Sequence, residues 1–167
     1  MTFQLYIMRH AKSDWSGSDT KDFDRPINQR GKKSAVRIGQ WMKENDFIPE
    51  KIISSPAERA RQTTRLVVEQ LSSLNSEMII YEKELYLADL DTLIEEIQLH
   101  KNDINSLMLV AHNPGLEQLI GFLSSKSGSE YRSMTTANLV IFEYPDNQFD
   151  PYIDKGKLIE FIKPKEL

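Results

Sequence analysis

The chain has 167 residues and no cysteine, and 40% of its residues are hydrophobic while 28% are charged. This composition indicates one compact globular domain over residues 1–167, and it excludes a disordered chain, a disulfide framework, a thiol nucleophile and cysteine-based zinc sites. The formal net charge of −4 disfavours bulk binding to nucleic acids, and the longest strictly apolar stretch, residues 107–111, is too short for a membrane span. Because residues 1–8 also lack the basic start of a secretory signal, we expect a cytoplasmic protein.

Short apolar runs alternate with helical patterns along the chain. Six runs have the length and composition of strands, at residues 4–8, 51–54, 78–81, 106–111, 137–144 and 157–163. Four patterns with apolar residues at every third or fourth position predict helices around residues 35–42, 60–71, 90–97 and 116–123. This alternation implies βαβ crossovers, so we predict an α/β three-layer sandwich with a mostly parallel central sheet of about six strands flanked by helices. The serine-rich residues 124–129 predict a surface loop.

Two of the three histidines come directly after predicted strands. Arg9 and His10 end the first strand, and His112 follows the fourth, where an Asn-Pro-Gly sequence stops it. Because the carboxyl ends of parallel strands meet at one edge of a sheet, we expect these side chains to lie together. One histidine in such a place is usually structural, but two at equivalent places indicate a functional site.

A third polar element follows the second strand. Ser55 and Pro56 begin a helix with Arg59 in its first turn, where free backbone N–H groups and the helix dipole favour an anion. Alone, Arg59 would be interpreted as a surface arginine. Together with Arg9, it could hold a phosphoryl group through two planar guanidinium groups, each capable of bidentate contacts.

A run of cations without acidic residues occupies part of the first predicted helix. Its members are Arg30, Lys32, Lys33 and Arg37. Two interpretations remain open for this run. It is either a solvated helix face, the usual outcome for such a run, or part of a basic pocket that suits a small anion such as phosphate.

Three motifs in chain order resemble those of the histidine phosphatase superfamily. Residues 9–11 read Arg-His-Ala, similar to its Arg-His-Gly signature, and residues 55–63 read Ser-Pro-Ala-Glu-Arg-Ala-Arg-Gln-Thr, similar to its second arginine motif. Residues 112–115 read His-Asn-Pro-Gly, similar to its second histidine motif. The short length, residues 22–28 and the pair Arg30-Gly31 further resemble the SixA-like phosphohistidine phosphatase branch. The likeness covers nearly the whole chain and weakens after about residue 124.

The resemblance implies a role for each matching residue. His10 would be the nucleophile and become transiently phosphorylated, while Arg9, Arg59 and a protonated His112 would bind the transferring phosphoryl group. The arginines already supply positive charge, and no Cys, His or carboxylate cluster has the sequence spacing of a metal site, so we expect no metal and no other cofactor. His100, near the end of the third helix, is expected to complement the helix dipole rather than to bind a metal.

The general acid is the main departure from the family. Its mutase-like members carry a glutamate in an acidic, glycine-containing motif after the third strand, and residues 82–89 do not match that motif. Asp22 and Asp89 are the candidates for protonating the leaving group, although each could instead serve in a turn or as a helix N-cap. Arg25 is expected either to orient the substrate or to pair with Asp22 or Asp24.

These observations and the resemblance together predict a metal-independent phosphatase that forms a phosphohistidine intermediate and acts on phosphohistidine in a partner protein. The predicted elements leave little sequence for a lid, so the site should be open, with Trp15 at its entrance. An imidazole leaving group also needs little help from an acid. Two alternatives remain: a phosphomonoesterase acting on a small phosphorylated metabolite, and a phospho-binding module without turnover. Neither a nucleic acid nor a membrane is expected as a partner.

Overall fold

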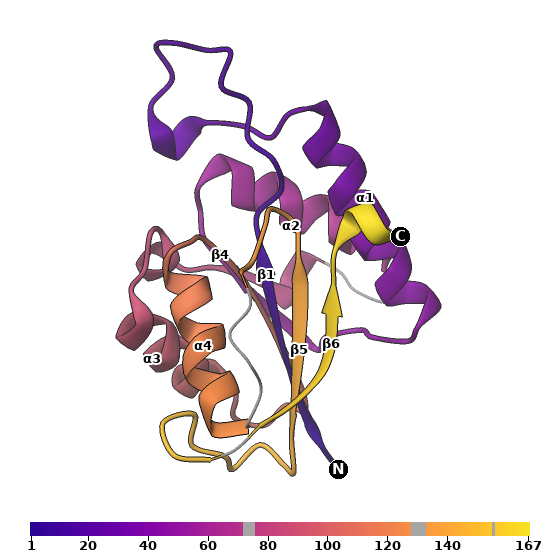
Figure 1. The fold of residues 1–167 in the computed structure, drawn as a ribbon, viewed down its shortest axis with the longest axis vertical. Helices are drawn as coiled ribbons and strands as arrows, with labels where there is room; N and C mark the ends of the chain where they lie inside the picture. Colours follow the sequence, from indigo (N-terminus) through magenta and orange to yellow (C-terminus); the bar gives the residue numbers. More distant parts are fainter. Residues whose placement is uncertain (72–75, 128–132, 155) are drawn as a thin grey trace.

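A computed structural model describes residues 1–71, 76–127, 133–154 and 156–167 of the chain (Figure 1). Six strands form one sheet in the order β3-β2-β4-β1-β5-β6. The strands are β1 (Phe3–Arg9), β2 (Lys51–Ser54), β3 (Ile79–Tyr81), β4 (Ser106–Ala111), β5 (Leu139–Tyr144) and β6 (Lys157–Ile162). The pairs β3-β2, β2-β4 and β4-β1 are parallel, whereas β5 pairs antiparallel with both β1 and β6. The predicted α/β sandwich with a mostly parallel sheet of about six strands is confirmed.

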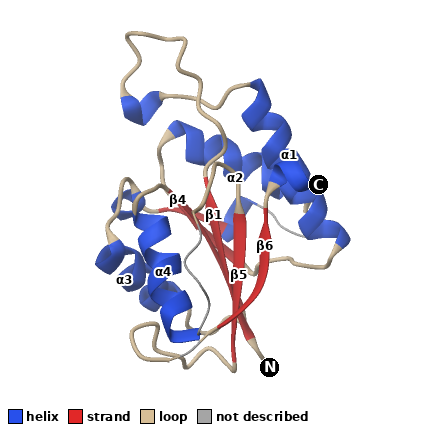
Figure 2. Ribbon diagram, viewed as in Figure 1, coloured by secondary structure: helices blue, strands red, loops and turns tan. Residues whose placement is uncertain are grey.

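Helices cover both faces of this sheet (Figure 2). On one face α1 (Gln29–Glu44) packs with α2 (Glu58–Gln70), and on the other α3 (Leu90–His100) packs with α4 (Gly115–Ser127). Side chains of β1 alternate between the two apolar clusters, since Tyr6 and Met8 join the cluster of α1 and α2 while Leu5 and Ile7 join that of α3 and α4. Each face of the sheet therefore has its own apolar core.

The carboxyl ends of β1, β2 and β4 are aligned with one another. Arg9 is paired with Ala111, and Ser54 with Val110. All six residues of β4 are buried, as expected for an interior strand of a parallel sheet with both faces covered. This alignment brings the residues that follow the three strands to one edge of the sheet, and the segment between β1 and α1 rises above that edge in Figure 1.

The segment that follows β1 is fixed against the start of α1. Asn28 caps α1 by accepting a hydrogen bond from the N–H of Gly31 at 2.8 Å, and its own N–H donates to the carbonyl oxygen of Lys12 at 2.8 Å. A Cβ at Gly31 would lie 2.5 Å from the same carbonyl oxygen, so only glycine allows this close approach. The backbone just after β1 is thereby held in place.

The predicted boundaries are not all correct, and two of the differences concern the loop expected at 124–129 and the strand expected at 137–144. The prediction of a surface loop at residues 124–129 is wrong for residues 124–127, which belong to α4. The helix continues here because Ser124 packs in the interior. Residues 128 and 129 lie outside the described residues. β5 begins at Leu139, since Ala137 has a φ of 61° and donates its N–H to the carbonyl oxygens of Arg9 and His10. Within the described residues, none of the helices combines the length and the apolar composition that a membrane span requires.

Candidate active site

His10 lies at the carboxyl end of β1, with 6% of its surface exposed. Its Nδ1 is 2.8 Å from the carbonyl oxygen of Ala11, and because a carbonyl can only accept, Nδ1 carries the ring hydrogen. The lone pair is therefore on Nε2, toward which the Nε–H of Arg59 points at 3.4 Å. Burial, followed by the charges of Arg59 and Arg9, lowers the pKa of His10 to about 4. At neutral pH His10 is thus a neutral imidazole, the form that can attack phosphorus.

His112 follows β4 and lies beside His10, with 5.1 Å between the ring centroids. Its Nε2 is 2.7 Å from the hydroxyl of Ser55, which sequence patterns do not assign to the site. Burial, followed by the neighbouring His10 and Arg59, lowers the pKa of His112 to about 3. The expectation of a protonated His112 is therefore wrong for the free protein at neutral pH, because its buried ring faces other cationic groups. This ring can offer a phosphoryl oxygen an N–H group without a full charge.

The protonation of these two rings can be measured directly. In the free protein, we expect the imidazole ¹⁵N shifts of His10 and His112 to stay constant from pH 8 down to about pH 5, because burial disfavours the charged rings. In the unfolded chain the two histidines take up protons near their ordinary pKa of 6.5, whereas in the native protein they do so only near 4 and 3. The unfolded state therefore binds more protons below pH 6.5, and the free energy of unfolding should fall as the pH drops from 6.5 toward these lower pKa values. An NMR titration midpoint near 6.5 for either ring would contradict a buried, neutral pair.

Arg59, in the first turn of α2, is oriented by Asp22 from the segment between β1 and α1. Nη1 of Arg59 donates to the carbonyl oxygen of Asp22 at 2.7 Å, and Nη2 donates to Oδ2 of the same residue at 3.1 Å. These two bonds leave the Nε edge of the guanidinium group turned toward His10. A planar group held in this way is suited to binding a tetrahedral anion beside the histidine.

Tyr86 is a site residue that no sequence pattern reveals. Its hydroxyl donates to Oδ2 of Asp22 at 2.6 Å, and its ring packs edge-on against His112 with 5.6 Å between centroids. The bond from Tyr86, followed by that from Arg59, lowers the pKa of Asp22 below its ordinary value. Asp22 does lie at the site, but it is ionised at neutral pH and holds no proton for a leaving group. The only signal in the sequence is the place of Tyr86 in the segment after the third strand, where the family's acidic motif is missing.

Asp89, the second candidate acid, is not brought to this site. It is exposed and caps α3, where its carboxylate accepts a hydrogen bond from the N–H of Thr92 at 2.9 Å. That bond lowers the pKa of Asp89, so its carboxylate is also ionised at neutral pH. The N-cap alternative for Asp89 is confirmed.

Arg9 and Arg25 add positive charge to the site. Nη1 of Arg9 donates to a main-chain carbonyl oxygen at 3.0 Å, and the Arg25 guanidinium group stacks over the ring of Trp15 at 3.8 Å from its centroid. Within the described residues, Arg25 forms no ion pair with Asp22 or Asp24, so the pairing expected for it is wrong because the guanidinium group turns to Trp15 instead. Of the two expectations for Arg25, a place beside the substrate remains.

These side chains surround a cavity of about 220 Å³, which we call the catalytic cavity. Its lining consists of Arg9, His10, Lys12, Ser13, Trp15, Asp22, Arg25, Arg59, Leu87, His112, Asn113 and Thr136. Among these described residues, four are Lys or Arg and one is acidic, so the cavity favours an anion. The structure therefore brings together all the predicted site residues except Asp89.

A group that could hold a metal ion lies elsewhere. Nε2 of His100 is 3.3 Å from Oε1 of Glu82 and 3.5 Å from Oε2 of Glu96, and one ligand atom of each of the three residues lies within 4.8 Å of the others. Sequence spacing does not reveal this cluster because Glu82 is far from His100 along the chain. None of the three residues lines the catalytic cavity, so a metal bound there would not contact a phosphoryl group beside His10.

Comparison with known proteins identifies the family. The sequence model of the histidine phosphatase superfamily (branch 1) matches residues 5–86. Protein Rv1276c of Mycobacterium tuberculosis is 33% identical over 123 residues, which are 74% of this chain and 73% of that protein. A chloroplastic protein of Arabidopsis thaliana, At3g52155, is 28% identical over 131 residues, and the match covers 74% of this chain but only 60% of the plant protein.

The fold agrees with this match. The solved structure of SixA from Agrobacterium tumefaciens is similar, with a TM-score of 0.79, 27% sequence identity and coverage of 97% of this chain and 98% of that one. The strands β1 and β4, which His10 and His112 follow, and the helix α2, which carries Arg59, lie within this shared fold. The chain therefore belongs to the histidine phosphatase superfamily, in its SixA-like branch, as the family model, the relatives and the shared fold indicate.

Proposed function

We propose that this protein is a metal-independent phosphatase that removes the phosphoryl group from phosphohistidine in a partner protein. The observation that carries the proposal is the chemistry of the catalytic cavity. A neutral His10 has its lone pair on Nε2, arginines surround it, and the one acidic residue among the described lining residues is an ionised Asp22. Such a cavity can transfer a phosphoryl group but gives little help to a poor leaving group.

The reaction takes place in two displacements. Nε2 of His10 attacks phosphorus as the bond to the substrate nitrogen breaks, and the departing imidazole takes a proton from water. The Nδ1–H bond to the carbonyl of Ala11 stabilises the positive charge that develops on the His10 ring. Water then attacks phosphorus, the bond from phosphorus to Nε2 breaks, and phosphate leaves the regenerated neutral histidine. The proton that the attacking water loses neutralises the hydroxide formed in the first displacement.

The surrounding groups stabilise the charge of the transferring phosphoryl group. Arg9 and Arg59 contribute two guanidinium groups, and His112 adds an N–H donor, so three groups can contact the equatorial oxygens. Asp22 acts as a positioning residue, because its carbonyl and carboxylate hold Arg59 with its Nε edge toward His10. Tyr86 in turn fixes the carboxylate of Asp22.

The choice of substrate follows from the leaving group. General acid catalysis contributes typically about 10²–10⁴-fold to such reactions, and an ionised Asp22 cannot supply it. An alkoxide therefore leaves slowly from this cavity, a phenolate leaves faster, and the imidazole of phosphohistidine leaves readily. The exposed side chain of Trp15 marks an open entrance, which suits a side chain presented by another protein.

A comparison of three substrates tests this proposal. We expect kcat/KM to be highest for a phosphohistidine protein, intermediate for an aryl phosphate and at least about 10²-fold lower for an alkyl phosphate such as glycerol phosphate. Asp22→Asn should lower kcat/KM for all three by a similar factor, since Asp22 positions Arg59 rather than donating a proton.

Other rankings would contradict the proposal. A preference for the alkyl phosphate would assign the protein to the metabolite phosphatases. A loss in Asp22→Asn confined to the alkyl phosphate would make Asp22 the general acid. Binding of all three substrates without turnover would indicate a phospho-binding module.

Metal independence has its own test. Prolonged EDTA treatment should leave kcat for the aryl phosphate unchanged, because the arginines supply the charge that a metal ion would otherwise provide. Glu96→Gln, which removes a ligand from the cluster with Glu82 and His100, should also keep full activity. Loss of turnover with EDTA that a divalent ion restores would refute the mechanism.

A further inference from the structure

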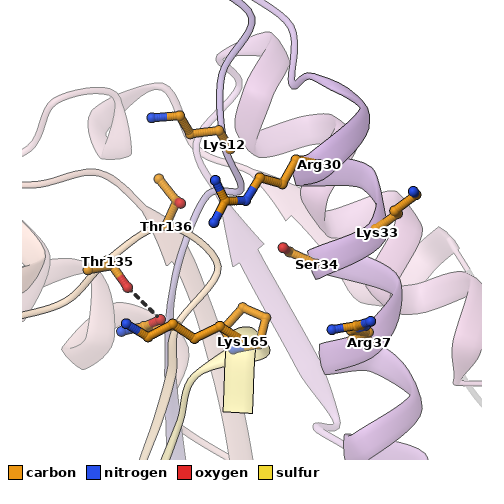
Figure 3. A pocket seen from close by; sticks show the side chains of 10 residues that line it. Lys12, Arg30, Lys33, Ser34, Arg37, Thr135, Thr136 and Lys165 are labelled. Carbon is orange, nitrogen blue, oxygen red and sulfur yellow. Dashed lines mark hydrogen bonds between the residues drawn. The ribbon is translucent and has the colours of Figure 1, made fainter. Parts of the chain in front are cut away.

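A second, larger cavity adjoins the catalytic cavity. It has a volume of about 540 Å³ and lies between α1, the segment before β5 and the C-terminal 3-10 helix Pro164–Glu166 (Figure 3). Five of its described lining residues are cationic and none is acidic: Lys12, Arg30, Lys33, Arg37 and Lys165. We call this cavity the cationic pocket. It carries a concentrated positive charge in a protein whose formal net charge is −4.

The cations of this pocket have no acidic partners among the described residues. The ion pairs that the described residues form involve Arg59 and His100, and none of the five cations. In Figure 3, Arg30 extends from α1 toward Lys12, Ser34 points into the hollow and Lys165 crosses its lower side, whereas Lys33 points outward. Like charges that line one cavity repel one another, and a bound anion would relieve that repulsion. Arg30 and Arg37 therefore line a basic pocket while their side chains stay exposed to solvent.

A buried amide supports a ligand in the same pocket. Asn138 lines the pocket and is fully buried, and its Oδ1 accepts a hydrogen bond from the hydroxyl of Thr135 at 2.9 Å. Within the described part of the chain, its Nδ2 has no hydrogen-bond partner. Buried polar groups in native proteins are nearly always satisfied, so this amide leaves hydrogen-bonding capacity unused in a residue that lines the pocket. Ser34 and Thr136 add hydroxyl groups to the same lining.

The cationic pocket shares part of its lining with the catalytic cavity. Lys12 and Thr136 line both of them, and Lys12 follows His10 by only two positions. A partner protein whose phosphohistidine reaches His10 would therefore lie close to the cationic pocket. The positive side chains are spread over about two turns of α1 and the C-terminal 3-10 helix, which suits several separate negative charges on a surface better than one compact ion.

We propose that the cationic pocket binds carboxylate side chains of the partner protein that lie next to its phosphohistidine. This inference rests on the proposed function, and it adds that the preferred partner presents an acidic surface around the phosphorylated histidine. The pocket then contributes to recognition and association, and the catalytic cavity alone performs the transfer.

The test removes two charges from the pocket without touching the catalytic cavity. Arg30→Gln/Arg37→Gln should lower kcat/KM for a phosphohistidine protein by about tenfold or more, mainly through KM, and should reduce its dependence on salt. Turnover of an aryl phosphate should stay within about twofold, because that substrate does not reach the pocket. The matched control is Lys32→Gln/Lys43→Gln, which removes two exposed cations from the same helix outside both cavities and should change neither substrate. Equal losses on both substrates, or no loss on the protein, would overturn the inference.

A binding experiment separates failure of this inference from failure of the proposed function. By calorimetry, hexaglutamate should bind the wild-type protein and the Lys32→Gln/Lys43→Gln control, and bind Arg30→Gln/Arg37→Gln at least about tenfold more weakly. This readout needs no turnover, so it stands even if the protein does not hydrolyse phosphohistidine. Binding of tripolyphosphate but not of hexaglutamate, weakened in Arg30→Gln/Arg37→Gln, would mean that the pocket takes a phosphate group instead. Binding of neither anion in a way that depends on Arg30 and Arg37 would remove the pocket as an anion site.

Discussion

Replacing His10 with alanine should abolish turnover of an aryl phosphate, with a loss in kcat of at least about 10³-fold, as is typical for removal of a catalytic nucleophile. The reason is specific to the geometry of the site. The bond from Nδ1 to the carbonyl of Ala11 makes Nε2 of His10 the available nitrogen, and His112 engages Ser55 through its own Nε2. A water molecule left in place of the imidazole is a much weaker nucleophile at neutral pH.

The control for this variant is His100→Gln, which alters a histidine that does not line the catalytic cavity and should keep near-normal kcat. Circular dichroism and thermal unfolding would show that His10→Ala remains folded. Near-normal turnover by folded His10→Ala would mean that the attacking group is not His10.

The second large effect is expected at Arg59, where lysine should lower kcat/KM by about 10²-fold or more. A lysine keeps the charge but has no planar group that can bind Asp22 through Nη1 and Nη2 and present Nε to His10 at the same time. Without that partner, the pKa of Asp22 should rise toward its ordinary value. Turnover kinetics measure the first effect, and carboxyl ¹³C shifts measured against pH report the second.

Arg65→Lys is the matched control for Arg59→Lys. Arg65 is on the same helix but is exposed and does not line the catalytic cavity, so its replacement should leave kcat/KM unchanged. Normal kinetics for both Arg59→Lys and Arg59→Ala would give Arg59 the role of an ordinary surface arginine, which its position in the sequence alone also allows.

The part of the site that could be predicted is the part fixed by strand ends. Apolar runs of strand length fix where β1, β2 and β4 end, and parallel pairing places those ends at one edge of the sheet. The residues that follow these strand ends along the chain include His10, Arg59 and His112. The local sequence pattern therefore predicts that their side chains lie close together. The same argument does not place Asp89, because the helix that begins after it uses its carboxylate as a cap.

What could not be predicted depends on contacts between distant segments and on burial. Tyr86 reaches Asp22 across 64 positions of the chain, and no local pattern specifies that bond. The neutral state of His112 follows from its burial beside His10 and Arg59, which only the packed structure reveals. Likewise, the run from Arg30 to Arg37 has the same sequence whether or not it lines a cavity, and the segment around Asn138 supplies the other side of that cavity.

The most direct test of the mechanism is to identify the phosphorylated residue during turnover. The wild-type protein would be mixed with an excess of aryl phosphate, quenched in alkali because phosphohistidine is labile to acid, digested and analysed by mass spectrometry. The mechanism predicts phosphate on Nε2 of His10, loss of that signal after acid treatment, and no signal in His10→Ala. Phosphate on another residue, or steady turnover with no phosphorylated protein at any time, would contradict it.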